Sequence, residues 1–185
     1  MATRPQTLAD QYEQLVQQNT FDLVGQPDVL CAPPSSNNNA FAYNFPGDKA
    51  GYNWGNVDLS CGAAGWYLSV EDLAKVLLSI NARDGKIFTE TPGNSQFTAM
   101  RSRNLGLDIN TTTQLEKNGG WSMGCDDNGA NCGSISTSAS IFGPVNGPNI
   151  IGILFINSNV SGGASDSLGA RQVMTNAYNH ALRPE

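Results

Sequence analysis

The residues best suited to chemistry are four consecutive ones, Lys117-Asn118-Gly119-Gly120, at the end of a short strand-like segment. The lysine supplies a compact positive charge, and the asparagine adds hydrogen-bond donors and an acceptor. The two glycines let the strand backbone approach a bound group without a side chain in the way. These four residues are therefore a candidate functional site. The alternative is that Lys117 is an ordinary exposed lysine on a strand.

Three strands and a helix must position this segment. Its own strand is predicted at about 114–124, and the next, at 133–143, is rich in small and β-branched residues. The run 149–157 is the most hydrophobic part of the chain, and it has the length and composition of a buried strand. A helix over 165–183 closes the chain. The sequence therefore predicts an α+β fold in which an antiparallel sheet carries the C-terminal helix on one face.

Two helices are predicted before the sheet. Thr7 is the expected cap of the first, whose apolar residues share one face: Leu8, Tyr12, Leu15 and Val16. Ser69 is the expected N-cap of the second, and Asp72, three residues later, completes a capping box. A further short helix is predicted at 95–103 and a short strand at 105–109.

A long irregular segment, from Leu30 to Ser60, separates the first two helices. Loops of this length inside compact domains are uncommon and often functional. The segment contains four aromatic residues that either line a substrate cleft or hold the loop onto the rest of the protein: Tyr43, Phe45, Tyr52 and Trp54.

Two of these stretches resemble the serine β-lactamase and penicillin-binding-protein superfamily, in its class C and esterase-like branch. Lys117-Asn118-Gly119 stands where the family has its Lys-Thr-Gly or His-Thr-Gly motif. The stretch 62–77, GAAGWYLSVEDLAKVL, is similar to the family segment that contains Ser-x-x-Asp-Leu-Ala. The resemblance covers about 8–182 and only the C-terminal part of the family's chain. It implies one incomplete β-lactamase-like domain over 1–185, with helices and a long loop in 1–110 and three strands plus a helix in 111–185.

The resemblance also implies a role for each residue of the motif. Lys117 would place a positive charge beside the nucleophile and leaving group, orient a substrate carboxylate and favour proton transfer. Asn118 would hydrogen-bond the substrate. Gly119 completes the motif, and the backbone N–H of Gly120 would be the second oxyanion donor.

Two motifs of the family are missing. The 185 residues contain no Ser-x-x-Lys and no Tyr-x-Asn, and Ser36-Asn37-Asn38, which fits the alternative form Ser-x-Asn, lacks the family context. Two hypotheses follow. In the first, the chain is the C-terminal portion of a serine hydrolase acting on ester, amide or β-lactam bonds, and it needs an N-terminal segment or chain that carries Ser-x-x-Lys. In the second, it is a stand-alone, non-catalytic binding domain of the same fold for peptide-like or glycan ligands.

The four cysteines suggest disulfides rather than a metal site. Cys125 and Cys132 flank a turn-forming sequence with Asn128-Gly129, so we expect a disulfide at the neck of a hairpin. For Cys31 and Cys61, a disulfide and free thiols are both open. The spacing is not that of a zinc site, and the sequence predicts neither a metal nor a cofactor. The one histidine, His180, is expected at the C-terminal end of the last helix.

Composition limits the partners of the chain. A net charge of −6 argues against nucleic acid as a partner. No apolar run approaches the ~20 residues that span a bilayer. Since the family's N-terminal strands are missing, we expect an open sheet edge that favours a homo-oligomer or is covered by residues 30–60. The location stays open, with a secreted or periplasmic parent as one interpretation.

Overall fold

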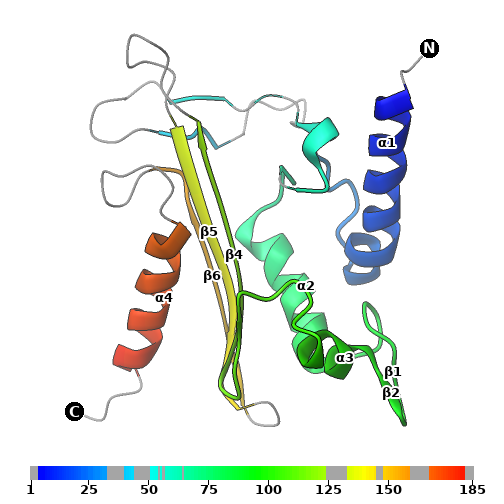
Figure 1. Ribbon diagram of the computed structural model, residues 1–185, viewed down its shortest axis with the longest axis vertical. Helices are drawn as coiled ribbons and strands as arrows, with labels where there is room; N and C mark the ends of the chain where they lie inside the picture. Colours follow the sequence, from blue (N-terminus) through cyan, green and yellow to red (C-terminus); the bar gives the residue numbers. More distant parts are fainter. Residues whose placement is uncertain are drawn as a thin grey trace. The chain divides into compact units, whose positions relative to one another are not determined.

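The computed structural model describes residues 4–32, 40–43, 51–53, 55, 57–63, 65–123, 133–144, 148–158 and 167–181. The chain divides into two compact units. Figure 1 labels the main helices and strands. The first unit comprises Met1–Asn39 and Trp54–Ala99, and the second Ala40–Asn53 and Met100–Glu185. One domain over 1–185 stays a prediction, because a division into compact units does not show that each folds alone.

The first unit begins with helix α1, Arg4–Val16. The predicted cap at Thr7 is wrong, because Thr7 lies inside this helix. Pro5 stands in the first helical turn, where the N–H that proline lacks has no partner within a helix, so the helix begins earlier than the predicted cap. The helical path continues through a π-helical turn, Gln17–Phe21, and a 3-10 turn, Asp22–Val24.

The capping box of the second helix is confirmed. Helix α2 spans Val70–Ala82, with Ser69 as its N-cap. The backbone N–H of Asp72 donates to Ser69 Oγ at 3.1 Å, and the N–H of Ser69 donates to Asp72 Oδ2 at 2.8 Å. The helix packs on the buried cluster of this unit, which consists of Phe21, Val29 and Val76. Partly buried residues around the cluster include Val16, Val24, Trp66, Leu68, Leu73, Ile80 and Ile87.

The remaining elements of the first unit are short. A 3-10 turn, Asp58–Ser60, precedes Cys61, which forms a disulfide with Cys31 at a Cα–Cα distance of 5.8 Å. One of the two possibilities left open for these cysteines is thereby confirmed. Strands β1, Glu90–Thr91, and β2, Asn94–Ser95, form an antiparallel hairpin. Helix α3, Gln96–Ser102, follows within the predicted range 95–103, and the boundary between the two units falls inside it, after Ala99.

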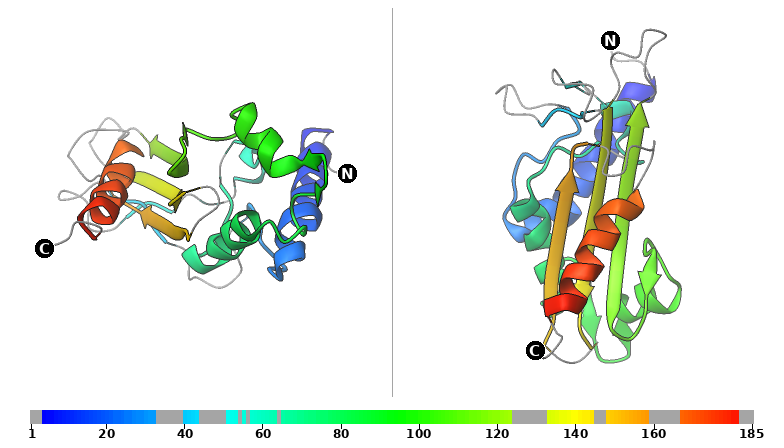
Figure 2. Two further views of the ribbon diagram at one scale, coloured as in Figure 1. Left: turned by 90° about the horizontal axis from the view of Figure 1, so that it is seen from below. Right: turned by 90° about the vertical axis from the view of Figure 1, so that its left-hand side faces the viewer.

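The second unit contains the antiparallel sheet, in the order β3-β4-β5-β6. The strands are β3 at Ile109–Asn110, β4 at Gln114–Met123, β5 at Gly133–Phe142 and β6 at Ile150–Ile156. Helix α4, Ser167–Ala181, lies along one face of the sheet (Figure 2). The predicted α+β arrangement of three strands and a C-terminal helix is confirmed, and the short strand predicted at 105–109 is β3, which joins the same sheet. That strand begins later than predicted because Asn104 and Gly106 have positive φ angles of 53° and 69° and form a turn.

Part of the long segment 30–60 joins the sheet unit. Ala42 pairs with Tyr52, and the backbone N–H of Tyr43 donates to the carbonyl oxygen of Asn157 at 2.7 Å, just after β6. The ring of Tyr43 lies where a side chain at Gly51 would be, 2.7 Å from an added Cβ. Tyr43 therefore holds its own loop together. Phe45 and Trp54 lie outside the described residues.

The face of the sheet under α4 is unusually polar. Glu116, Ser136, Ser138 and Ser140 are all buried on it, with relative exposures of 2% or less. Apolar contacts complete the attachment of α4: the rings of Tyr178 and Phe142 stack at 4.4 Å, and Ala170 is fully buried. No helix in the described part of the chain is both long enough and apolar enough to cross a membrane.

Candidate functional site

The outer edge of β4 holds a carboxylate at the predicted motif. Lys117 Nζ lies 3.3 Å from Asp108 Oδ1, and the backbone N–H of Asn118 donates to Asp108 Oδ2 at 2.7 Å. One oxygen of the carboxylate thus meets a cation and the other a main-chain amide. The Lys117 side chain is 60% exposed, and that of Asp108 is 35% exposed. The motif therefore binds a carboxylate at a surface that solvent reaches.

The register of β3 on β4 explains why this edge is open beyond Glu116. β3 pairs with β4 only through Ile109 opposite Glu116 and Asn110 opposite Leu115. The N–H of Asp108 still donates to the carbonyl oxygen of Glu116 at 2.8 Å, but no described strand pairs with the outer edge of β4 after that residue. The Asp108 side chain then takes the place of the next strand residue as the partner of the Asn118 N–H.

The main-chain groups of Gly120 point to the same edge as those of Asn118. Along an extended strand, the hydrogen-bonding groups of alternate residues share one edge. Glu116 and Asn118 both turn theirs toward Asp108, so Gly120 presents its N–H and C=O on this side about 7 Å farther along. Gly120 is exposed. The edge thus offers a cation and two main-chain amides in a row.

The charge of the bound carboxylate is stabilised by its neighbours. Partial burial raises the pKa of Asp108. The Asn118 N–H, the Lys117 ammonium and the more distant charge of Arg171 lower the pKa by more than burial raises it, so the pKa lies below its ordinary value of 3.8. Asp108 is therefore ionised at neutral pH and paired with Lys117.

The side chains of Asn118 and Lys117 emerge on opposite faces of the sheet. Asn118 lies opposite Ser138 on the face that α4 covers, and its Oδ1 is buried without a hydrogen-bond partner among the described residues. Gly119 lies opposite Thr137, whose Oγ1 would be 2.6 Å from a Cβ at position 119. A side chain at position 119 would therefore force the Thr137 side chain or the strand to shift. The site uses the backbone N–H of Asn118, whereas the Asn118 side chain belongs to the polar layer between the sheet and α4.

Sequence reasoning missed the acidic partner of the motif and the ion pair behind it. Glu116 Oε1 accepts hydrogen bonds from Arg171 Nε at 3.0 Å and from Ser138 Oγ at 3.3 Å. Its Oε2 accepts from Gln114 Nε2 at 2.6 Å. The Glu116 side chain has no exposure to solvent. This buried pair fixes β4 against α4 one residue before Lys117.

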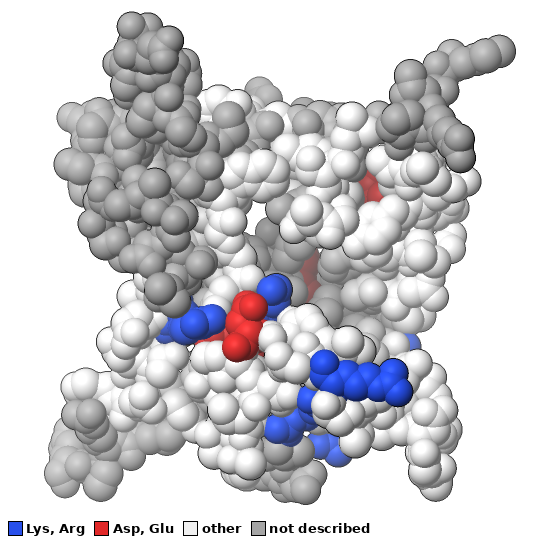
Figure 3. Space-filling model, viewed as in Figure 1, with Lys and Arg blue, Asp and Glu red and all other residues white. Residues whose placement is uncertain are grey.

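Charged groups are sparse on the molecular face drawn in Figure 3. Acidic and basic side chains lie against one another near its middle, and most of the described surface around them is uncharged. This matches the low content of charged residues, 14% of the sequence.

Other predicted residues lie away from the edge of β4. His180 is exposed in the last turn of α4, as predicted. Cys125, Cys132 and Ser165, at which the last helix was predicted to begin, lie outside the described residues. In the described part of the chain, Lys117 Nζ and the Asn118 N–H together are suited to holding an anion. Comparisons of the chain with protein-family models, with curated proteins and with solved structures found no match.

Proposed function

We propose that this chain is the C-terminal portion of a β-lactamase-like serine hydrolase acting on ester, amide or β-lactam bonds, and that it is not catalytic alone. The observation that carries the proposal is the carboxylate of Asp108 held by Lys117 Nζ and the Asn118 N–H. A substrate carboxylate that displaced Asp108 would find the same two partners. The order of β4, β5, β6 and α4 after the motif is the order that the resemblance implies.

The edge of β4 favours a particular kind of substrate. A ligand lying along it would place a carboxylate at Lys117 and an acyl oxygen near the N–H of Gly120, about two strand residues away. An amide donor aimed at a developing oxyanion stabilises the transition state of acyl transfer. We therefore expect acyl compounds that carry a free carboxylate near the scissile bond. Lys117 would release Asp108 and form an ion pair with the incoming carboxylate instead.

The nucleophile in this proposal comes from a segment with Ser-x-x-Lys. The isolated chain should then hydrolyse neither a chromogenic cephalosporin nor a p-nitrophenyl ester. Mixed with a segment that carries Ser-x-x-Lys and Tyr-x-Asn, it should become active. In that mixture Lys117→Ala should lower kcat/KM by ~10²-fold or more, about 3 kcal/mol, the size expected for removing one electrostatic stabiliser.

Lys86→Ala is the matched control, because Lys86 is an exposed lysine paired with an aspartate, Asp84, at 3.3 Å. It should leave turnover unchanged. Intact turnover of the Lys117→Ala mixture would contradict the assignment of the motif. A serine of the isolated chain labelled by an organophosphonate would contradict the claim that the chain is inactive alone. Ser136 is a poor candidate for such labelling, since it is 2% exposed under α4.

The alternative is a stand-alone, non-catalytic binding domain of the same fold. It is favoured by the absence of Ser-x-x-Lys and Tyr-x-Asn from the 185 residues, while the carboxylate-holding geometry is already complete. An NMR titration of the isolated chain with an N-acyl amino acid tests it. Asp108→Ala should strengthen binding by freeing Lys117, and Lys117→Ala in that background should abolish it. Binding with this pattern, together with failed reconstitution, would favour the binding domain.

A further inference from the structure

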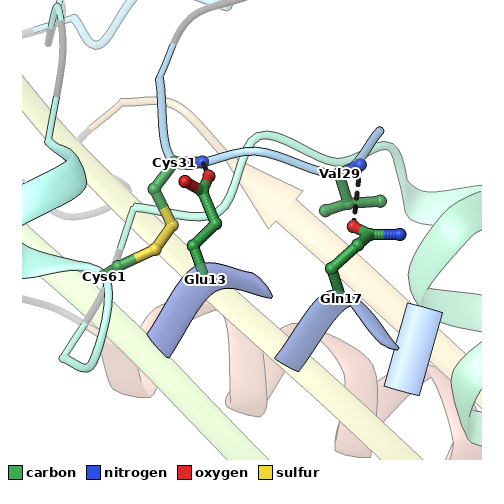
Figure 4. Close-up of a disulfide and its surroundings, with 5 residues drawn as sticks. All are labelled: Glu13, Gln17, Val29, Cys31 and Cys61. Carbon is green, nitrogen blue, oxygen red and sulfur yellow. Dashed lines mark hydrogen bonds between the residues drawn. A yellow bond between two sulfur atoms is a disulfide. The ribbon is translucent and has the colours of Figure 1, made fainter. Parts of the chain in front are cut away.

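A second group of chemically reactive residues lies in the first unit, around the disulfide. Cys31 and Cys61 are buried, with relative exposures of 0% and 3%. Glu13, from α1, points its carboxylate at them (Figure 4). One carboxylate oxygen of Glu13 and the two Sγ atoms lie within 4.8 Å of one another. Two sulfurs and a carboxylate at this separation are a set of ligands for a divalent cation.

The position of Glu13 is fixed by the backbone of Cys31. The N–H of Cys31 donates to Glu13 Oε1 at 2.6 Å (Figure 4). One hydrogen bond uses one of about four lone-pair positions that a carboxylate offers, so Glu13 can still bind a cation. Four residues later on the same helical path, Gln17 Oε1 accepts a hydrogen bond from the N–H of Val29 at 3.1 Å. Two contacts thus hold the segment 29–31 in place independently of the disulfide.

We infer that reduction of the Cys31–Cys61 disulfide creates a binding site for a thiophilic divalent cation of the zinc class, with Glu13 as the third ligand. A dithiol reductant would pass two electrons and two protons to the Sγ–Sγ bond, and its own sulfurs would join in a disulfide. The cation would then displace both thiol protons to solvent and bind two thiolates and a carboxylate. Three protein ligands leave the fourth position of a tetrahedral cation to water.

The geometry allows this exchange without a large backbone movement. The Cα atoms of the two cysteines are 5.8 Å apart, and the contacts from Glu13 and Gln17 do not depend on the bond between the sulfurs. The spacing of 30 residues between the cysteines does not suggest a zinc site in the sequence. Only the fold brings Glu13 to them. The disulfide and the cation would therefore be alternative cross-links at one place.

Cadmium titration of the full chain tests the inference. The variant Cys125→Ser/Cys132→Ser removes the other two thiols, and a phosphine reductant opens the disulfide as water supplies the oxygen of the phosphine oxide. After the phosphine is removed without air, one equivalent of Cd²⁺ should produce the thiolate-to-cadmium charge-transfer band in the ultraviolet. The oxidised chain should show no such band. Absence of the band from the reduced chain would overturn the inference.

Two carboxylate variants in the same background test the role of Glu13. Glu13→Gln should weaken Cd²⁺ binding at least about tenfold, while Glu71→Gln, which alters an exposed carboxylate on α2, should leave it unchanged. Equal affinity in the Glu13 variant would overturn the three-ligand site. Should reduction unfold the chain, refolding with Cd²⁺ present should restore the near-ultraviolet circular dichroism and raise Tm. Failure to refold with the cation would also overturn the inference.

Discussion

The buried ion pair between Glu116 and Arg171 gives the sharpest test of how the sheet is held. Arg171→Met keeps much of the length and apolar stem of the side chain but removes its charge. Among the described residues, the buried Glu116 carboxylate would then keep two neutral donors, Gln114 Nε2 and Ser138 Oγ. We expect the sheet unit to lose stability through this uncompensated charge and not through lost packing.

The expected loss is about 3 kcal/mol. Removing one partner of a buried pair typically costs about 3–5 kcal/mol. The lower end applies here because the Arg171 side chain is 27% exposed and partly solvated, although that of Glu116 is fully buried. The double variant Glu116→Gln/Arg171→Met leaves no charge at either position, and the substituted amide would retain hydrogen-bonding capacity. It should therefore recover at least about half of the loss, as a double-mutant cycle measures.

Hydrogen exchange of the β4 and β5 amides, followed by NMR in native conditions, measures the stability of this unit without a signal from the other. Gln172→Met, on the exposed side of α4, is the control and should change stability by less than about 0.5 kcal/mol. A loss under about 1 kcal/mol for Arg171→Met would refute the reasoning. So would a double variant less stable than the single one.

Three further predictions concern the cysteines and Asp108. Replacing Cys31 and Cys61 by serine should lower the free energy of unfolding by about 3–4 kcal/mol, the chain-entropy value for a separation of 30 residues; a loss below about 1 kcal/mol in urea denaturation would contradict it. Because the folded-state pKa of Asp108 is lowered, its stabilising effect is present above the ordinary value of 3.8 and is lost as pH falls through the folded pKa. Asp108→Asn should therefore be less stable than the natural chain at neutral pH and converge with it in acid; parallel stability curves would exclude this linkage. Cys125 and Cys132 should be joined under oxidising conditions, and uptake of iodoacetamide by both in the native, unreduced chain would show otherwise.

The elements with local signals were predictable from the sequence. Ser69 and Asp72 specify the start of α2 through side-chain contacts to main-chain groups three residues away. The run 149–157 specifies β6 by its short, β-branched and apolar composition. In both cases the residues that determine the structure are neighbours in the chain. The start of α1 differs from the prediction because Pro5 suits a first helical turn, and Thr7 therefore lies inside the helix.

The partners of the candidate site were not predictable in this way. Asp108 and Lys117 meet because the turn at 104–106 delays the start of β3, and β3 then pairs with β4 so that Ile109 lies opposite Glu116. Glu116 and Arg171 are 55 residues apart, and no local pattern links them. The signal that was present is the alternation of polar residues along β4 and β5. Such alternation usually indicates a face exposed to water, whereas here α4 covers it.

The polar layer under α4 has a consequence for how this unit can open. The two ends of the helix attach differently: Arg171, near its start, binds Glu116, while Tyr178, near its end, stacks on Phe142. If the first turns of α4 fray, water enters a layer of serines that can hydrogen-bond to it at once. Ser140 Oγ, which lacks a partner among the described residues, would gain one. Fraying at that end would thus expose a polar face of the sheet to water and not an apolar patch that could bind another chain. Local opening there need not lead to aggregation.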